Sequence, residues 1–384
     1  MAESLRIGIT CYPTYGGSGV IATELGTELS RRGHRVHVIS YALPRRLERY
    51  TENLFFHEVE INPYPLFEYP PYSLALASKM AEVATYERLD LLHVHYAVPH
   101  ATSAYLARAI LRERSPRIVT TLHGTDITLV GNERSLLPIT RLSIERSDGV
   151  TAVSQYLRAA TYDKLNVSSD TRIEVIPNFV DTEVFKPGAA SSCVCRLVQP
   201  GEKVLCHVSN FRPVKRILDV MAVFRTVARK LPARLLLVGD GPDRSAAERY
   251  AHENGIADQV NALGKQDSIN EILACADLLL LLSNTESFGL SALEALACGV
   301  PVIATRTGGL PELVEHGKVG YLAEIGDVET MSQLAIELLE DDQRRAAFGA
   351  AGRALALERF RTESVVDAYE AFYRTVLERP SQGL

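Results

Sequence analysis

The stretch EVIPNFVDTEVFKPG, residues 174–188, lies just short of the middle of this 384-residue chain. A β-like run over 173–176 stops at Pro177, and a second proline is followed by a glycine at Pro187 and Gly188. Proline and glycine interrupt regular strands and helices, so they mark turns and loops. The stretch is either a surface loop within one domain or a boundary between two. The pattern on its two sides decides between these possibilities.

Strand-like runs alternate with helix-like runs on both sides of this stretch. Helical spacing shows, for example, at Ile21, Leu25 and Leu29, which lie four residues apart and share one helix face. Such alternation predicts parallel sheets with helices on both faces, and several strands are apolar throughout, as expected when both faces are covered. The expected strands are residues 6–10, 35–40, 89–96, 117–124, 148–154 and 172–178, and then 203–210, 233–241, 260–264, 276–283 and 300–306.

These strands could form one large sheet, but the alternation breaks over residues 181–201, which are rich in proline, glycine and small residues. A break of this kind favours a domain boundary. After Gly326 the pattern is only helical. We therefore expect an α/β protein with two Rossmann-like, doubly wound domains, over 1–180 and 186–358. The C-terminal helix, at about 360–378, is expected to pack back on the first domain.

Composition and charge exclude several classes of protein. Hydrophobic residues make up 46% of the chain, and the net charge of −6 gives no bulk attraction to nucleic acid or to an anionic membrane. The longest apolar run, 276–283, is far too short to span a bilayer, and residues 1–10 lack the apolar region of a signal peptide. Only Cys193 and Cys195 of the six cysteines lie close together, without zinc-finger or disulfide-framework spacing. We expect a cytoplasmic protein with reduced thiols.

A glycine-rich turn, CYPTYGGSGV (11–20), follows the first expected strand. Ligands of doubly wound sheets bind beyond the carboxyl ends of the strands, and glycines there let backbone N–H groups approach a phosphate or carboxylate. The glycines at 16, 17 and 19 fit this arrangement, but their spacing matches neither the dinucleotide nor the P-loop pattern. A tight turn that needs glycine for steric reasons also explains them.

Histidines gather at two further strand ends, in HVHYAVPH (93–100) and TLHGTD (121–126). Three histidines within eight residues suggest a metal, but no nearby acidic cluster completes a site. Core histidines that support the site are the simpler interpretation, and no metal is expected. His123 is better placed than the others, because it stands at a strand tip before Gly124 and can face a ligand.

Two basic residues follow the first strand of the second half, in SNFRPVKR (209–216). Arg212 and Lys215 lie where the strand ends and the next helix begins, so both could reach one polyanion. A charge-assisted hydrogen bond of this type contributes about 1.5–3 kcal/mol. A solvated basic face is the alternative.

The most informative stretch is SNTESFGLSALEALACGVPVIATRTGGLPELV (283–314). Glu286 lies in the loop after a buried strand, and Glu294 falls about two turns into the helix that follows. Residues 288–290 would present free N–H groups at the start of that helix, a seat for a diphosphate. A carboxylate at either position can accept hydroxyls of a ribose or a sugar. A solvated helix face is the alternative, and the apolar neighbours at 293 and 295–297 weaken it.

These residues resemble the retaining glycosyltransferases of family 4, which have the GT-B fold of two Rossmann-like domains facing across a cleft. The E-x7-E pattern of Glu286 and Glu294 is the mark of that family, and GDGP (239–242) and TGGLPELV (307–314) match its usual strand and loop endings. The chain departs from many members in having Ser287 where they have glycine.

The first half looks most like the members of family 4 that act in bacillithiol biosynthesis. The similar stretches are ITCYPTYGGSGVIATELG, YPPYSLALASKMAEVA, LDLLHVHYAVPHA and IVTTLHGTDIT, and the resemblance runs from residue 6 to about 375. The segment around Cys193 and Cys195 is least similar. The resemblance implies transfer of N-acetylglucosamine from UDP-N-acetylglucosamine to the hydroxyl of L-malate, with retention and without a metal or other cofactor.

The resemblance also implies roles for single residues. Arg212 and Lys215 would neutralise the diphosphate as the glycosidic bond breaks, Glu286 would hold the donor sugar, and His123 would touch that sugar; these four form the expected catalytic set. Malate would lie among Ser18, Tyr96, His123 and Arg141, where the fork of Arg141 suits a carboxylate. The donor would be bound by Gly17, Asn210, Arg212, Lys215, Glu286, Phe288, Gly289, Leu290 and Glu294.

Other functions remain open from the residues alone. A related transferase could use another sugar nucleotide or a phosphorylated acceptor such as an inositol phosphate, because Arg141 would bind a phosphate equally well. A nucleotide-sugar isomerase needs an acid/base pair at the sugar, which E-x7-E does not supply. A nicotinamide oxidoreductase would be expected to carry G-x-G-x-x-G after the first strand of a domain, and the absence of this motif there argues against that class. The sequence leaves open whether the chain forms a homo-oligomer.

Overall fold

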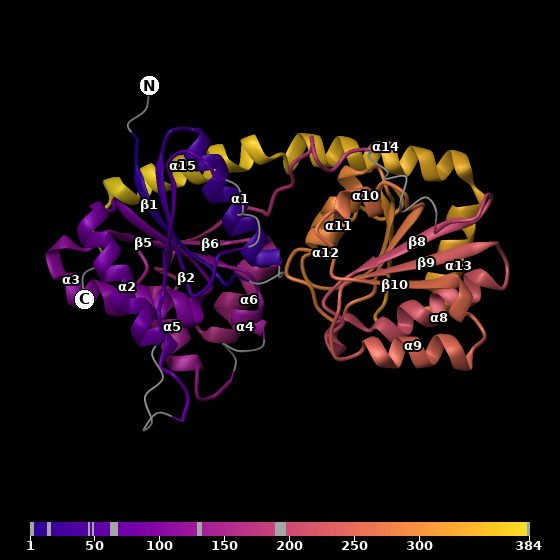
Figure 1. Ribbon diagram of the computed structural model, residues 1–384, viewed down its shortest axis with the longest axis horizontal. Coiled ribbons are helices and arrows are strands. Elements are labelled where there is room, and N and C mark those ends of the chain that lie inside the picture. The colour runs from indigo at the N-terminus through magenta and orange to yellow at the C-terminus, as the bar shows by residue number, and fades with distance from the viewer. Residues whose placement is uncertain are drawn as a thin grey trace. The chain divides into compact units, whose positions relative to one another are not determined.

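A computed structural model describes residues 4–13, 17–44, 47, 50–61, 68–128, 133–188 and 197–381. The chain divides into two compact units (Figure 1). The N-terminal unit contains Met1–Asn178 and Glu363–Leu384, and the C-terminal unit contains Phe179–Thr362. Cys193 and Cys195 lie outside the described residues.

The N-terminal unit is built on a parallel sheet of seven strands in the order β3-β2-β1-β4-β5-β6-β7. The central strands are buried along their length, because helices cover both faces of the sheet (Figure 1). The strands are β1 (Arg6–Thr10), β2 (Arg35–Ser40), β3 (Leu54–Glu58), β4 (Leu91–His95), β5 (Arg117–Leu122), β6 (Gly149–Ala152) and β7 (Ile173–Val175). The helices are α1 (Gly17–Arg31), α2 (Tyr72–Glu87), η2 (Ala97–Ala101), α3 (Thr102–Leu111), η3 (Arg112–Arg114), α4 (Thr125–Thr128), α5 (Leu137–Glu145), α6 (Gln155–Leu165) and α15 (Thr362–Glu378).

The C-terminal unit repeats this architecture with six parallel strands in the order β10-β9-β8-β11-β12-β13. Its strands are β8 (Lys203–Val208), β9 (Ala233–Val238), β10 (Val260–Gly264), β11 (Leu278–Leu281), β12 (Val302–Thr305) and β13 (Gly320–Ala323). Its helices are η4 (Pro213–Lys215), α8 (Ile217–Ala228), α9 (Arg244–Glu253), η5 (Ala257–Gln259), α10 (Ile269–Leu273), α11 (Leu290–Ala297), α12 (Leu310–Leu313), α13 (Val328–Glu340) and α14 (Asp342–Arg359).

The predicted fold class, two doubly wound α/β domains, is confirmed by these two sheets. Two strands were not expected. β3 is an edge strand with half-buried and exposed residues, so LFFHE lacks the continuous apolar run that marks a covered strand. β13 reads GYLA, so it begins with a glycine and lacks the run of large apolar residues that marks a covered strand.

The last helix, α15, belongs to the N-terminal unit and packs closely against its sheet (Figure 1). Gly149 of β6 is required at this contact, because a Cβ there would lie 2.6 Å from Cγ2 of Val376. The hydroxyl of Tyr373 lies 2.7 Å from Nδ1 of the buried His93 on β4. The helix therefore contributes both apolar area and a buried polar contact to the unit.

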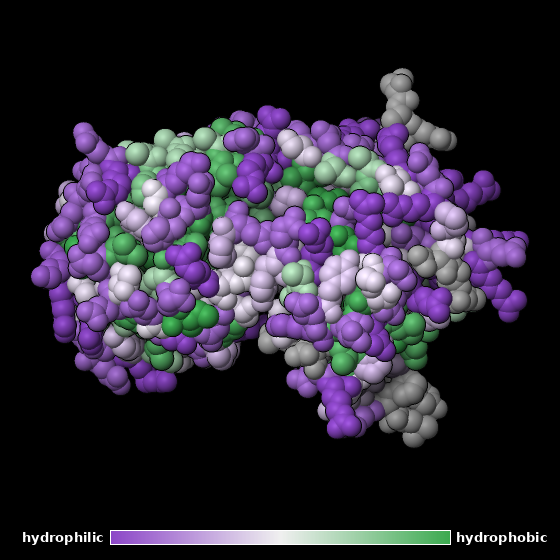
Figure 2. Space-filling model, turned by 180° about the vertical axis from the view of Figure 1, so that it is seen from behind, coloured by the Kyte–Doolittle hydropathy of each residue, from purple (hydrophilic) through white to green (hydrophobic). Residues whose placement is uncertain are grey.

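Hydrophilic residues cover most of the visible surface of each unit, with hydrophobic residues in smaller patches (Figure 2). Within the described residues, no helix combines the length and the apolar character that crossing a bilayer requires.

Candidate active site

Each sheet reverses its strand order next to its first strand, between β1 and β4 in the N-terminal unit and between β8 and β11 in the C-terminal unit. Ligands of doubly wound folds bind beyond the carboxyl ends of the strands at such switch points. Most of the predicted site residues follow these strands. Ser18, Tyr96 and His123 come after β1, β4 and β5, while Arg212, Lys215 and Glu286 come after β8 and β11.

Ser18 and Tyr96 lie in contact in the N-terminal unit. The Ser18 hydroxyl donates a hydrogen bond of 2.8 Å to Oη of Tyr96, although 78 residues separate them. The Tyr96 backbone has φ of 88°, a conformation that turns the chain sharply out of β4. Burial raises the pKa of the Tyr96 hydroxyl to about 12, against the effect of the Ser18 hydrogen bond. Both groups therefore stay neutral at pH 7 and can bind the hydroxyl or carboxylate of a ligand.

His123 joins the same cluster, since its ring centroid lies 5.3 Å from that of Tyr96. Its Nε2 lies 2.8 Å from Nδ1 of His95. Burial lowers the pKa of His123 to about 3, and it lowers that of His95 well below its usual value. A neutral imidazole carries one N–H, so one ring donates to the other and Nδ1 of His123 is not used in this contact.

The other histidines of the cluster are built into the core. Nδ1 of His93 contacts the Tyr373 hydroxyl, and its Nε2 lies 2.7 Å from the Thr121 hydroxyl. His100 is buried and its Nδ1 lies 2.5 Å from the backbone oxygen of His95. Both nitrogens of His93 are thus engaged with hydroxyl groups, which makes it a structural residue.

Asp126 is a buried residue beside this cluster that the sequence reasoning did not identify. It is buried, and its carboxylate accepts hydrogen bonds from the backbone N–H groups of Ala97 (3.0 Å) and Gly124 (2.9 Å). It therefore ties the loop after Tyr96 to the loop after His123. Burial raises the pKa of Asp126 to about 6, and the backbone hydrogen bonds act in the opposite direction. Its position three residues after His123 and two after Gly124 was the only available signal.

Arg141 and Gly17 are less closely tied to this cluster. Arg141 is an exposed residue of α5, and no hydrogen bond or ion pair among the described residues joins it to Ser18, Tyr96 or His123. Nor does it pair with Glu145, whose carboxylate accepts a hydrogen bond of 3.0 Å from the backbone N–H of Ser168. Gly17 is exposed at the start of α1.

In the C-terminal unit the central contact joins Lys215 to Glu286. The Lys215 ammonium group donates a short hydrogen bond to Oε1 of Glu286, which also accepts one of 2.9 Å from the Ser283 hydroxyl. The two charged side chains are only 19% and 13% exposed. The carboxylate and the ammonium group therefore hold each other in place at the carboxyl ends of β8 and β11.

The TGGLPELV loop, residues 307–314, contacts the backbone of Glu286. The backbone N–H of Gly309 donates to the backbone oxygen of Glu286 at 2.8 Å. Gly308 has φ of 59°, and a Cβ there would lie 1.8 Å from that same oxygen. Only glycine permits this close approach, so the glycine pair fixes the backbone that carries the carboxylate.

The remaining donor residues line the start of α11 and the end of β8. Gly289 caps α11, Phe288 is buried and Leu290 is the first helical residue, so their N–H groups lie at the positive end of the helix. Glu294, the fifth residue of α11, is 6% exposed. Asn210 and Arg212 are exposed after β8 and can reach a ligand in solution.

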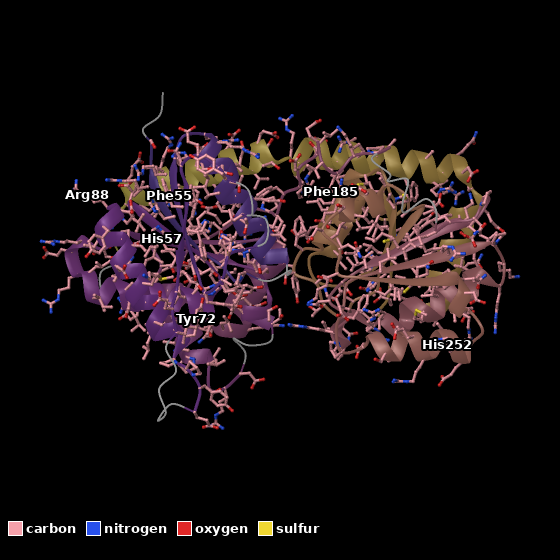
Figure 3. All side chains as sticks on the ribbon, in the orientation of Figure 1. Phe55, His57, Tyr72, Arg88, Phe185 and His252 are labelled. Atoms are coloured by element: carbon pink, nitrogen blue, oxygen red, sulfur yellow. The ribbon has the colours of Figure 1, made fainter. Side chains whose placement is uncertain are left out.

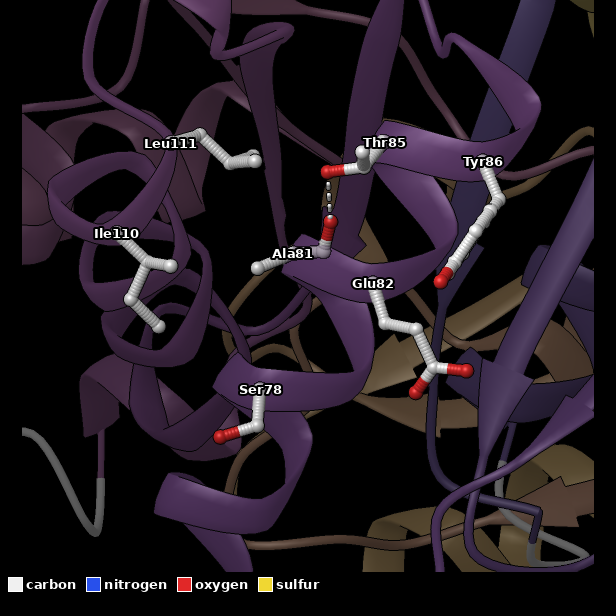
Figure 4. A pocket seen from close by; sticks show the side chains of 7 residues that line it. All are labelled: Ser78, Ala81, Glu82, Thr85, Tyr86, Ile110 and Leu111. Carbon is white, nitrogen blue, oxygen red and sulfur yellow. Dashed lines mark hydrogen bonds between the residues drawn. The ribbon is translucent and has the colours of Figure 1, made fainter.

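A shallow groove of about 390 Å³ lies elsewhere, between α2 and α3 (Figure 4). None of the predicted site residues lines it. Its lining residues are Ser78, Ala81, Glu82, Thr85, Tyr86, Ile110 and Leu111.

Both halves of the chain match known protein families. The family description "Glycosyltransferase Family 4" matches residues 15–184, and "Glycosyl transferases group 1" matches residues 196–355. The chain is 50% identical over 380 residues to N-acetyl-alpha-D-glucosaminyl L-malate synthase of Bacillus anthracis, covering 99% of both chains. The chain belongs to glycosyltransferase family 4.

A more distant relative is D-inositol 3-phosphate glycosyltransferase of Segniliparus rotundus, which is 30% identical over 94% of this chain and 85% of its own length. Among solved structures, Anabaena Alr3699/HepE in complex with UDP-glucose superposes with a TM-score of 0.81 at 22% identity, over 97% of this chain and 100% of that chain. This likeness confirms the expected GT-B fold.

Proposed function

We propose that this glycosyltransferase moves N-acetylglucosamine from UDP-N-acetylglucosamine to the hydroxyl of L-malate, with retention at the anomeric carbon, as the first step of bacillithiol biosynthesis. The observation that carries the proposal is the 50% identity, over 99% of both chains, to N-acetyl-alpha-D-glucosaminyl L-malate synthase. Identity that extends through the acceptor-side stretches of the N-terminal unit supports a shared acceptor as well as a shared fold.

The C-terminal unit supplies the groups that would bind the donor. Lys215 and Arg212 would neutralise the diphosphate, and the N–H groups at the start of α11 would add two or three hydrogen bonds to it. Glu294, buried on α11, would accept both ribose hydroxyls. Glu286, held by Lys215 and Ser283, would accept hydroxyls of the transferred sugar.

The reaction breaks the bond between C1 of the sugar and the β-phosphate oxygen, and it forms a bond from C1 to the malate hydroxyl oxygen. For retention without an enzymic nucleophile, the malate hydroxyl approaches from the leaving-group side and gives its proton to the departing phosphate oxygen. Negative charge on that phosphate grows as the bond breaks. Lys215 and Arg212 would therefore bind the transition state more tightly than the ground state. We propose that this pair replaces a metal ion.

The N-terminal unit supplies the groups that would bind the acceptor. Malate is a dicarboxylate, so at least one cation is needed, and Arg141 would provide it with two parallel hydrogen bonds. The neutral hydroxyls of Ser18 and Tyr96 would contact the other polar groups of malate. His123, whose Nδ1 is not used in the contact with His95, would donate to or accept from the donor sugar.

A panel of substrates tests this assignment. The protein is incubated with UDP-N-acetylglucosamine, UDP-glucose or GDP-mannose as donor, each with L-malate or D-inositol 3-phosphate as acceptor. We expect product only where UDP-N-acetylglucosamine is combined with L-malate. Mass spectrometry of the products gives the result. Efficient glycosylation of the inositol phosphate, with malate inert, would instead favour the function of the relative from Segniliparus rotundus.

A further inference from the structure

Three potential metal ligands lie together in the N-terminal unit, away from the groups assigned above. They are His37 on β2, His57 on β3 and Glu87, the last residue of α2. Each residue offers one nitrogen or oxygen ligand atom, and these three atoms all lie within 4.8 Å of one another. Figure 3 labels His57 and Phe55 of β3, and Arg88, which follows Glu87.

The geometry of the sheet explains why these residues meet. In the parallel pairing of β2 with β3, His37 stands opposite Phe55 and Ile39 stands opposite His57. Side chains two residues apart in a strand point to the same face, so His37 and His57 are diagonal neighbours on one face of the sheet. Nδ1 of His37 lies 3.0 Å from Nε2 of His57.

His37 is the fixed member of the group. Its side chain is 1% exposed and stacks on the Phe55 ring at 4.9 Å between centroids. Its buried Nε2 has no hydrogen-bond partner among the described residues, and it lies 3.8 Å from Oε2 of Glu87, beyond hydrogen-bonding distance. A buried nitrogen without a partner costs free energy, so this one is directed at a position where a ligand would be favourable.

We propose that His37, His57 and Glu87 bind one Zn²⁺ ion, or a similar divalent transition metal. Two imidazoles and one carboxylate are a familiar zinc ligand set, and water would complete the tetrahedron. Ligand atoms of tetrahedral zinc lie roughly 3.3 Å apart for bonds of about 2.0–2.1 Å. Glu87 can close the remaining distance, because it is 32% exposed at a helix end.

The protonation of the group favours the metal-bound form. Burial lowers the pKa of His37 to about 4, although Glu87 acts in the opposite direction, and burial also lowers the pKa of His57. Both imidazoles are thus neutral at pH 7, the form that ligates metals. The charged neighbours are Arg35, 3.6 Å from Glu87, and Lys79 and Glu82 of α2 near His57.

The site would support the fold without taking part in sugar transfer. Glu87 precedes the amino-terminal end of β4 by four residues, whereas Tyr96 follows the carboxyl end of that strand. A metal there would join the edge strand β3 to β2 and α2. The inference does not rest on the proposed reaction, so either can fail without the other.

The test is zinc binding by the full-length protein, purified without a polyhistidine tag and stripped with a chelator. Calorimetry with ZnCl₂ should show one saturable equivalent, and visible absorption after titration with Co²⁺ should show a tetrahedral site. His57→Gln and Glu87→Gln should each weaken zinc binding at least about tenfold, the loss that even an outer-shell partner can cause. Circular dichroism establishes that both variants are folded.

Two substitutions serve as matched controls. Glu113→Gln changes an exposed carboxylate of η3 in the same unit, and His252→Ala removes an exposed histidine of the C-terminal unit (Figure 3). Both should bind zinc like the wild type. The proposal is overturned if the wild type shows no saturable equivalent, or if either His57→Gln or Glu87→Gln binds zinc with unchanged affinity.

Discussion

Lys215→Gln is the substitution that most sharply separates a catalytic lysine from a structural one. The Lys215 ammonium group is 19% exposed and is held by Glu286, so it is oriented before any donor arrives. A charge-assisted hydrogen bond in such a partly buried site is worth about 1.5–3 kcal/mol. Because each 1.36 kcal/mol corresponds to a factor of ten in rate, its loss in the transition state should lower kcat/KM by about 10- to 200-fold.

The assay is steady-state kinetics with UDP-N-acetylglucosamine and L-malate, together with calorimetry of UDP binding. We expect kcat to fall more than UDP affinity, since charge on the diphosphate grows as the glycosidic bond breaks. Lys318→Gln is the matched control, because Lys318 is 63% exposed and its partner is the surface residue Glu315. If Lys215→Gln kept kcat/KM within threefold of the wild type, Lys215 would be only an ion-pair partner of Glu286.

Four further results are expected. Turnover should survive EDTA, because Lys215 and Arg212 are assigned the role of a metal, and loss of activity that magnesium or manganese restores would contradict this. Removal of zinc from the proposed site by EDTA should instead lower the thermal stability of the protein. Glu294→Ala should weaken UDP binding by the free energy of one hydrogen bond to a charged acceptor, about 1.5–3 kcal/mol, whereas Glu286→Ala should mainly lower kcat. Equal weakening of UDP binding by the two substitutions in calorimetry would refute these separate roles. Arg141→Lys should raise the KM for malate because it loses the bidentate guanidinium contact, and Arg141→Ala should raise it further, while the UDP affinity of both variants stays within about twofold of the wild type. An unchanged malate KM would place Arg141 outside the acceptor site. Urea titrations should show the free energy of unfolding falling as the pH drops from 6.5 toward 4, because burial lowers the pKa of His37, His100 and His207 to about 4, so the unfolded chain binds more protons than the folded chain in this range. A free energy of unfolding that stayed constant over this range would contradict the neutral state of these rings.

The sequence was sufficient for the fold because hydrophobic periodicity is local. Runs such as LLLL of β11 are buried on both faces, and they identify a covered strand without any knowledge of their neighbours. β3 escaped this reasoning because an edge strand alternates between half-buried and exposed residues. Its recognition depends on pairing with β2, which is a tertiary contact.

The sequence suggested candidate site residues one by one, but it did not indicate the contacts between them. Lys215 and Glu286 were both identified at strand ends, yet the strand order that makes β8 and β11 neighbours cannot be read from the chain. The same holds for Ser18 and Tyr96. Asp126 was not identified at all, because its position is defined by hydrogen bonds from backbone N–H groups of two different loops. Long-range polar contacts therefore had to come from the structure.

The most direct test of the proposed reaction is the structure of its product. UDP-N-acetylglucosamine and L-malate labelled with ¹³C are incubated with the protein, and the product is examined by NMR. We expect an anomeric proton with the small coupling of an α-linkage and a correlation from that proton to the hydroxyl-bearing carbon of malate. A β-linked product would contradict retention. Release of UDP with free N-acetylglucosamine and unchanged malate would contradict the assignment of malate as the acceptor.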